Sequence, residues 1–279
     1  GYSYDITLNI SGGTFTSNGD AIKKFVKDGD TNATRTIAVS GGQFSSTVNS
    51  DYCAPGFVPK DNGNSNYGVE MATGNVTEIL DAQGNTVRAY DSLDKAIAAA
   101  QDGQTVKLLS DVVLTSTLSI AADKKITLDL NGCKISADMN GPHMICNAGY
   151  LAITDSSTAK TGEIAKIGDA SNFGYVIENH GTMLLESCKI TSTSSVSSAI
   201  ENGWFTPEQN TGNTNCTMTI QNAEVTSVNA AGGLYTVKND DYGVMVINGG
   251  IFTNGTEGAG AVLNWNNLTI YNGTFTGTS

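Results

Sequence analysis

The sequence predicts an all-β fold, a parallel β-helix in which successive coils of the chain stack along one axis. Three observations predict it. Two apolar residues separated by one, a short turn and a third apolar residue recur along the chain, with the spacing h-x-h-x4-h. The turn of each copy admits only small or turn-forming residues at its centre. A separate triplet, apolar-x-Asn, recurs between the copies in the second half of the chain.

The h-x-h part of the pattern alternates with a period of two, which is typical of a strand with one buried face. An eighth, looser copy begins at Leu151 and Ile153 and resumes at Ile164. A repeat of roughly 20 to 30 residues indicates stacked coils that cover one another's apolar faces. The seven regular copies are Leu8/Ile10/Phe15, Ile37/Val39/Phe44, Leu128/Leu130/Ile135, Met183/Leu185/Ile190, Met218/Ile220/Val225, Met245/Ile247/Phe252 and Leu268/Ile270/Phe275.

The turn inside each copy supports this interpretation. The second residue after the h-x-h part is Gly or Asn in six of the seven copies, and these residues tolerate a positive φ. The residue that follows is small in all seven, as close packing of one coil on the next requires.

The apolar-x-Asn triplets predict an asparagine ladder. Asparagines stacked at one turn can hydrogen-bond their side-chain amides from coil to coil. The alternative is a set of unrelated turn asparagines. The predicted ladder residues are Asn147, Asn179, Asn202, Asn239 and Asn264.

The chain divides into three predicted regions. Residues 1–50 carry two copies of the pattern and are interpreted as the terminal coils of a preceding β-helix unit. Residues 51–88 hold two of the four prolines and are interpreted as a connector with a small hairpin, in which residues 68–74 pair with 85–88. Residues 89–279 form the main β-helix domain, and its first strands are expected between residues 106 and 120. Because the pattern is cut at both ends, we expect the chain to be part of a longer protein.

One helix is predicted, over residues 92–100. Leu93, Ala96 and Ile97 give it an apolar stripe, and Asp91 or Ser92 can cap its start. We expect this short N-terminal helix to cap the exposed end of the first coil of the main domain.

Five segments resemble a family of large, repeat-containing surface proteins of gut-type bacteria, and look like tandem pectate-lyase-like β-helix modules. The resemblance implies a right-handed coil, secretion, an extracellular location at the bacterial cell surface, further repeats in the same polypeptide and an adhesive or scaffold role. It identifies no ligand. The segments are ISGGTFTS (10–17), VSGGQFSS (39–46), YCAPGFVPKDNGNSNYGV (52–69), YDSLDKAIAAAQDGQTVKLLSDV (90–112) and KITLDLNGCKIS (125–136).

Composition excludes several classes of function. The net charge of −12 provides no basic surface for nucleic acid, and no apolar run is long enough for a membrane span. Five cysteines without CxxC spacing argue against a disulfide framework and a zinc site. We therefore expect no nucleic-acid partner, no membrane insertion and no cofactor.

The sequence also argues against catalysis. The only arginines, Arg35 and Arg88, precede the main coil, and the only acidic pair in that coil is Asp240-Asp241. His143 and His180 are out of step with the repeat, so no shared metal site is expected. We predict a non-enzymatic module, an adhesin or a rigid stalk. The alternative is a polysaccharide-active lyase or hydrolase of the same fold, which would need three or more facing carboxylates and a basic residue.

A candidate binding edge follows the ladder asparagines. Aromatic and acidic side chains there suit stacking on sugar rings or contact with a surface protein, so a host or microbial glycan or a surface protein is the expected partner. The plainer interpretation, which we favour, is that these aromatics only pack insertions onto the coil. A spacer without any ligand is a third possibility. The candidate residues are His180, Trp204, Phe205, Asp240, Asp241, Tyr242 and Trp265.

Overall fold

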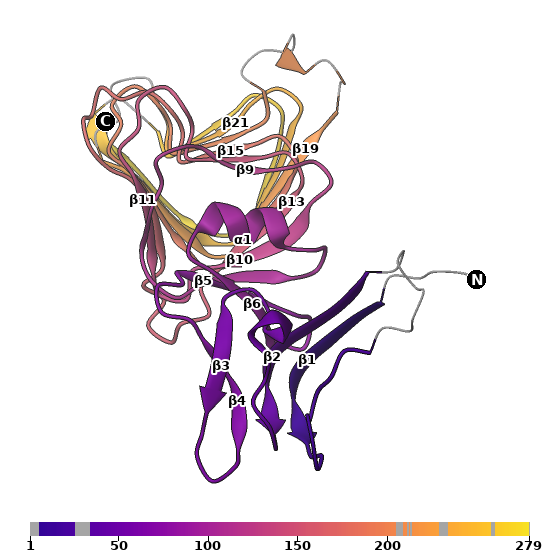
Figure 1. The fold of residues 1–279 in the computed structure, drawn as a ribbon. Coiled ribbons are helices and arrows are strands. Elements are labelled where there is room, and N and C mark those ends of the chain that lie inside the picture. Colours follow the sequence, from indigo (N-terminus) through magenta and orange to yellow (C-terminus); the bar gives the residue numbers. More distant parts are fainter. Residues whose placement is uncertain are drawn as a thin grey trace. The chain divides into compact units, whose positions relative to one another are not determined.

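The structure is a computed structural model that describes residues 6–25, 34–204, 209–210, 212, 214–228, 234–257 and 260–278 (Figure 1). The chain separates into two compact units, residues 1–100 and 101–279. Compactness does not show which part of the chain folds by itself, so the predicted domain limits at residues 50 and 88 stay predictions.

The first unit contains the two N-terminal copies of the pattern. Strands β1 and β2 pair in parallel, with Leu8 opposite Ile37 and Ile10 opposite Val39. The two phenylalanines that close the copies stack with ring centroids 5.0 Å apart. The pattern therefore aligns here as the sequence predicts. The elements of this unit are β1 (Ile6–Phe15), β2 (Arg35–Phe44), the 3-10 turn η1 (Ser50–Tyr52), β3 (Phe57–Asp61), β4 (Tyr67–Met71), β5 (Thr77–Leu80), β6 (Thr86–Tyr90) and α1 (Leu93–Ala99).

Residues 51–90 hold two hairpins in place of the single predicted one. β3 pairs with β4, and β5 pairs with β6, both antiparallel. The predicted pairing of 68–74 with 85–88 does not form, because two local turns each close a strand onto its neighbour. In one turn the Asp61 carboxylate accepts the Gly63 amide, and in the other the Asp81 carboxylate accepts the amides of Gln83 and Asn85.

The predicted helix is confirmed as α1, whose buried residues Leu93, Ala96 and Ile97 form its apolar stripe. It packs against β5 and β6. Ser92 is the N-cap residue, although its side chain makes no capping hydrogen bond. No helix in the described ranges combines the length and the apolar character that crossing a bilayer requires.

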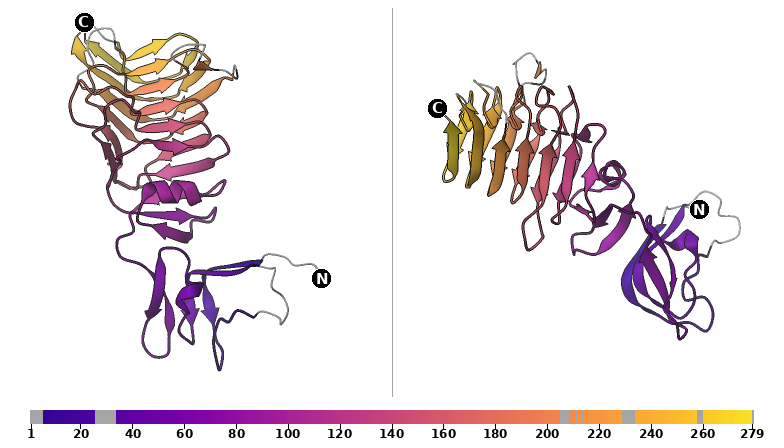
Figure 2. Two further views of the ribbon diagram at one scale, coloured as in Figure 1. Left: turned by 45° about the horizontal axis from the view of Figure 1, so that its top comes forward. Right: turned by 90° about the vertical axis from the view of Figure 1, so that its left-hand side faces the viewer.

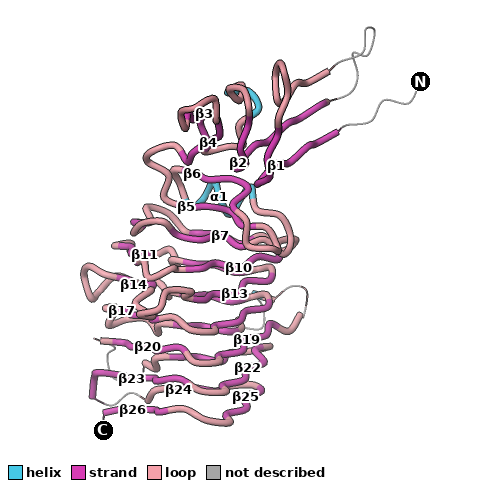
Figure 3. The backbone as a smooth tube through the Cα atoms, turned by 90° about the horizontal axis from the view of Figure 1, so that it is seen from below, coloured by secondary structure: helices cyan, strands magenta, loops and turns pink. Residues whose placement is uncertain are grey.

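The second unit is a parallel β-solenoid, as the sequence predicts (Figure 2). Each of the first six coils supplies one strand to each of three sheets, and the last described coil supplies β25 and β26 to two of them. Every neighbouring pair of these strands is parallel, as the stacked strands in Figure 3 illustrate. The right-handed sense implied by the resemblance stays a prediction.

We call the three faces sheets 1, 2 and 3. Sheet 1 contains β7 (Thr105–Leu108), β10 (Lys125–Asp129), β13 (Tyr150–Thr154), β16 (Thr182–Leu185), β19 (Cys216–Ile220), β22 (Gly243–Ile247) and β25 (Asn267–Ile270). Sheet 2 contains β8 (Val112–Val113), β11 (Lys134–Ala137), β14 (Glu163–Lys166), β17 (Lys189–Ser192), β20 (Ala223–Ser227), β23 (Gly250–Glu257) and β26 (Thr274–Thr278). Sheet 3 contains β9 (Leu118–Ile120), β12 (Ile145–Asn147), β15 (Ile177–Asn179), β18 (Ile200–Asn202), β21 (Val237–Asn239) and β24 (Val262–Asn264).

In sheet 1, the strands of the later coils pair as the predicted alignment of the copies requires. One earlier copy pairs with a shift of two residues. Met183, Met218, Met245 and Leu268 pair in series, in line with Leu151 of the looser copy. The copy assigned to Leu128, Leu130 and Ile135 was aligned incorrectly, since Leu128 pairs with Ile153 and Ile126 with Leu151. The turn after β10 is two residues longer, and a slip of two residues leaves the same strand face buried, so apolar alternation cannot detect it.

The five asparagines of sheet 3 form a continuous row of hydrogen-bonded side chains. Asn147 donates to Asn179 over 2.7 Å, Asn179 to Asn202 over 2.7 Å, Asn202 to Asn239 over 2.8 Å and Asn239 to Asn264 over 2.8 Å. The first four side chains are buried, with 0–2% exposed. Each of these amides therefore bonds to the next coil, and those of Asn147, Asn179 and Asn239 also bond to a backbone group of their own turn.

Replacing Asn202 with Leu, which has the same number and branching of side-chain heavy atoms, should destabilise the solenoid. The change removes one acceptor of Asn179, which keeps the Thr217 carbonyl, and leaves the buried Asn239 amide oxygen without its donor from the ladder. One unsatisfied buried group costs about 1–3 kcal/mol, or roughly 2–12 °C in Tm. The matched control is Asn264→Leu, at an exposed position with one ladder neighbour, where a smaller loss is expected. Thermal unfolding would measure both, and equal losses would contradict a special role for the buried amides.

Candidate functional site

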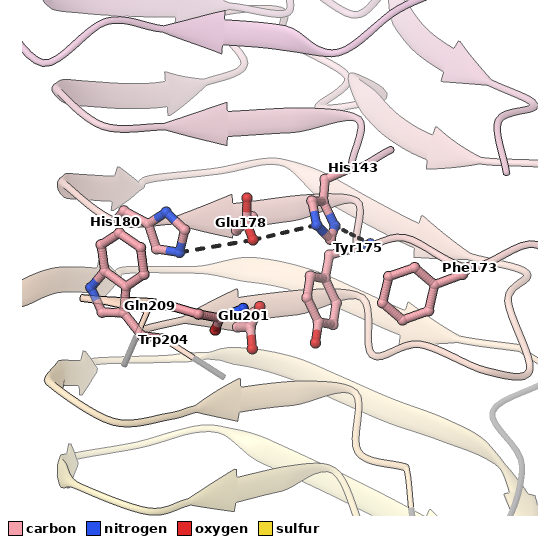
Figure 4. Close-up of a pocket in the computed structure, with 8 residues that line it drawn as sticks. All are labelled: His143, Phe173, Tyr175, Glu178, His180, Glu201, Trp204 and Gln209. Carbon is pink, nitrogen blue, oxygen red and sulfur yellow. Dashed lines mark hydrogen bonds and ion pairs between the residues drawn. The ribbon is translucent and has the colours of Figure 1, made fainter. Parts of the chain in front are cut away.

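A pocket of about 400 Å³ opens on the outer face of sheet 3 (Figure 4). It arises from the alternation within each three-residue strand. Ile177 and Asn179 of β15 point into the coil, so the residue between them, Glu178, faces out. The described lining residues are His143, Phe173, Tyr175, Glu178, His180, Glu201, Trp204 and Gln209.

The parallel register aligns the outward residues of sheet 3 in one row. Glu178 lies between Cys146 on β12 and Glu201 on β18, and Glu201 lies beside Lys238 on β21. Neighbouring strands lie about 4.8 Å apart, so the two glutamates start from adjacent backbone positions. The coil repeat thus places two carboxylic acids side by side at the pocket floor.

Glu178 sits between two imidazoles, as Figure 4 shows. Its Oε1 lies 3.4 Å from Nε2 of His143 and 3.8 Å from Nε2 of His180, and the Cys146 thiol donates to Oε2 over 3.1 Å. Nδ1 of His143 accepts the backbone N–H of Tyr175 at 3.0 Å, so the proton of the neutral ring lies on Nε2 and faces Glu178.

Burial governs the ionisation of these groups. It lowers the pKa of both His143 and His180, even though Glu178 favours their charged forms. Burial, together with the hydrogen bond to Glu178, raises the pKa of the Cys146 thiol. The imidazoles are therefore neutral and the thiol is protonated at pH 7.

Glu201 is only 2% exposed. Burial raises its pKa to about 8, and its hydrogen bond with Asp240 acts in the same direction. Nζ of Lys238 lies 2.6 Å from Asp240 Oδ2 and 3.6 Å from Glu201 Oε1. The Oε1 atom of Glu201 has no hydrogen-bond partner among the described residues. Glu201 thus holds a proton near neutral pH, and its buried Oε1 atom lies beside the Lys238 ammonium.

Two aromatic stacks flank this row. The rings of His180 and Trp204 lie parallel with centroids 3.6 Å apart. On the other side, His143 and Tyr175 stack at 4.9 Å, and the Phe173 ring meets His143 edge-on at 6.0 Å. The pocket therefore has aromatic walls and an acidic floor.

The wall that carries Phe173 and Tyr175 is anchored from inside the coil. The ammonium of Lys166, 1% exposed, donates to the backbone carbonyls of Phe173 and Gly174. Burial lowers the pKa of Lys166 to about 8. Gly174 has φ 117°, and a Cβ there would come within 2.4 Å of the Pro142 carbonyl. A glycine and a buried lysine together fix this segment.

The opposite wall depends on a turn after the ladder. Gly203 has φ 121°, and a Cβ there would meet the backbone of Asp240 and Asp241 within 3.0 Å. This close approach lets the backbone N–H of Trp204 donate to the backbone carbonyl of Asp241 over 3.0 Å. The contact orients the indole that stacks on His180.

The structure brings only part of the predicted binding edge together. His180 and Trp204 line the pocket, and Asp240 contacts Lys238 beside it. Asp241 contributes its backbone to Trp204, and Tyr242 occupies a turn with φ 61°. Trp265 is 68% exposed and does not line the pocket. Phe205 lies outside the described residues, so the single binding edge as a whole stays a prediction.

The sequence patterns marked the triplets that contain the two glutamates and Lys238, but did not identify these residues as part of a site. The middle residue of each apolar-x-Asn triplet must face outward when its neighbours face inward, and this alternation was the available signal. Glu178, Glu201 and Asp240 with Lys238 form the cluster of carboxylates and a basic residue that the sequence analysis did not assemble. One argument against catalysis is thereby removed, and the absence of catalysis stays a prediction.

The described residues contain no group of three or more His, Cys, Asp or Glu side chains placed to hold a metal ion. The fold and the pocket define the class of the protein as a parallel β-solenoid with an aromatic-walled acidic pocket on one face. Comparisons with protein-family models, curated proteins and solved structures found no match. The resemblance to bacterial surface proteins therefore stays an expectation.

Replacing Glu201 with Gln should stabilise the protein at neutral pH. Because the folded pKa of Glu201 is raised, the folded state keeps a proton that the unfolded chain releases, so stability falls as pH rises from about 4.5 towards 8. An amide can replace the protonated carboxyl without ionising. The expected gain at about pH 7.5 is about 1–3 kcal/mol, or roughly 2–10 °C, and it should vanish near pH 4.5.

Thermal unfolding as a function of pH would measure this effect. Glu224→Gln is the control, since the Glu224 side chain is 49% exposed and pairs with Lys189 on the surface. A gain for Glu201→Gln that is independent of pH would contradict the raised pKa.

Proposed function

We propose that the chain is a glycan-binding module of an extracellular bacterial surface protein, and that the pocket on sheet 3 holds one sugar residue of the glycan. The observation that carries the proposal is the combination of aromatic walls with converging carboxyl groups in one cavity. Its volume lies in the range of about 300–1,000 Å³ that is typical of ligand pockets.

Each part of the pocket has a use in sugar recognition. The Trp204 ring, backed by His180 at 3.6 Å, offers an apolar surface for the C–H face of a sugar ring. Glu178 and Glu201 offer acceptor oxygens for hydroxyl groups, and Gln209 adds an amide. The Ser-, Thr- and Asn-rich composition and the resemblance support an extracellular adhesin or stalk in which this coil is one of several.

Glycan and mucin arrays would test this function with the wild-type chain and two variants. Trp204→Ala should lose at least tenfold in apparent affinity, because it removes the stacking wall. Trp265→Ala is the matched control, since it removes an exposed indole outside the pocket and should bind as wild type does. Binding lost only in Trp265→Ala would place the site elsewhere on the coil, and no binding by any form would leave the stalk as the function.

A second candidate function is hydrolysis of a glycosidic bond. The specific observation in its favour is that Glu201, with a pKa of about 8, lies one strand from Glu178. A protonated carboxyl beside a second carboxyl is the arrangement that glycoside hydrolysis uses, as general acid and as nucleophile or base. Glu201 would protonate the leaving oxygen, and Glu178 would attack the anomeric carbon or activate water.

Incubation of the chain with every glycan that it binds would test hydrolysis. If Glu201 is the general acid, Glu201→Gln should lower the rate at least a hundredfold and leave the glycan Kd within a few-fold of wild type. Release of new reducing ends, followed by chromatography, measures the rate. Bound glycans that stay intact with the wild-type chain would sink the enzymatic candidate and leave binding.

A further inference from the structure

We infer that the pocket selects ligands with a positively charged primary amine, and that within the proposed function the preferred glycan is one of free-amine amino sugars. The choice of a sugar rests on the proposed glycan binding. The choice of an amine rests on the charge and geometry of the pocket.

Glu178 is the carboxyl group of the described lining that no lysine or arginine neutralises. Its neighbours His143 and His180 are neutral at pH 7 because burial lowers the pKa of each. Glu201 differs, because it holds a proton near neutral pH and the Lys238 ammonium lies 3.6 Å from its Oε1 atom. The same ammonium lies 5.9 Å from the centroid of the Tyr175 ring. Glu178 is therefore the described group of the pocket that lacks a positive partner.

One acceptor oxygen of the pocket lacks a close donor in the described part of the chain. Oε1 of Glu178 has imidazole nitrogens only at 3.4 Å and 3.8 Å, beyond the usual N–H···O distance of about 2.9 Å. A primary ammonium has three donors and can bond to this oxygen and to a second acceptor at once.

The Trp204 wall favours a cation as well. The face of an indole ring attracts positive charge within about 6 Å of the ring centroid, and the Trp204 ring stacks on the His180 imidazole. An N-acetyl group would replace the ammonium with a neutral amide and leave the charge of Glu178 uncompensated. The net charge of −12 also attracts cationic glycans over longer distances.

The test compares two oligosaccharides of equal length, a glucosamine tetramer with free amines and an N-acetylglucosamine tetramer. Calorimetry at about pH 5.5 keeps the sugar amine charged, because neighbouring oxygens lower its pKa below that of a lysine amine, and should give at least tenfold tighter binding of the free-amine form. Glu178→Gln should reduce this preference at least fivefold. Glu201→Gln should change it little, because an amide replaces a carboxyl that is already protonated. Glu224→Gln, on the outside of sheet 2, should leave it unchanged.

The outcomes separate this inference from the proposed function. Equal binding of both tetramers would overturn the amine preference and leave glycan binding in place. If neither tetramer binds, titration with 1,5-diaminopentane and with tetramethylammonium shows whether the pocket binds a primary amine outside a sugar. Diamine binding that Glu178→Gln abolishes would support the amine inference and overturn the sugar. Tetramethylammonium binding alone would overturn the primary amine, and no binding of any probe would overturn both. Thermal unfolding of each variant confirms that it is folded.

Discussion

The register between successive coils of sheet 3 is the constraint on which the rest of the solenoid depends. Each strand there has three residues, too few to fix its own position through backbone pairing. The buried asparagine at its end supplies the missing specificity, because its amide bonds to the asparagine of the next coil only when that coil is aligned. A slip would leave buried polar groups unsatisfied, which costs more than one ordinary hydrogen bond contributes.

The same register creates the pocket. Glu178, Glu201 and Lys238 are far apart in sequence, and they become neighbours because each precedes a ladder asparagine. The glycine turns and the buried Lys166 then place the aromatic walls around this row. This arrangement is unfavourable for folding, because two carboxylic acids lie together where water has little access. One of them is protonated near neutral pH as a result. A structural coil has no need of this arrangement, which supports a role in ligand binding.

Sequence patterns predicted the features that repeat. The h-x-h-x4-h copies predicted the solenoid, the single helix was found within one residue at each end, and the apolar-x-Asn triplets indicated the row of asparagines. Errors arose where the period is ambiguous. A slip of two residues at Leu128 keeps the same face buried, and the two short turns near Asp61 and Asp81 were interpreted as one connector.

The sequence by itself determined the architecture and which side chains enter the coil, because alternation and turn chemistry are local properties. Only the tertiary structure decided which outward residues meet. His143 reaches Glu178 across one coil, and Trp204 stacks on His180 from the next. The lengths and paths of the loops between coils fix those contacts, and no local pattern encodes them. The burial that protonates Glu201 likewise exists only once the coils and their loops have packed around it.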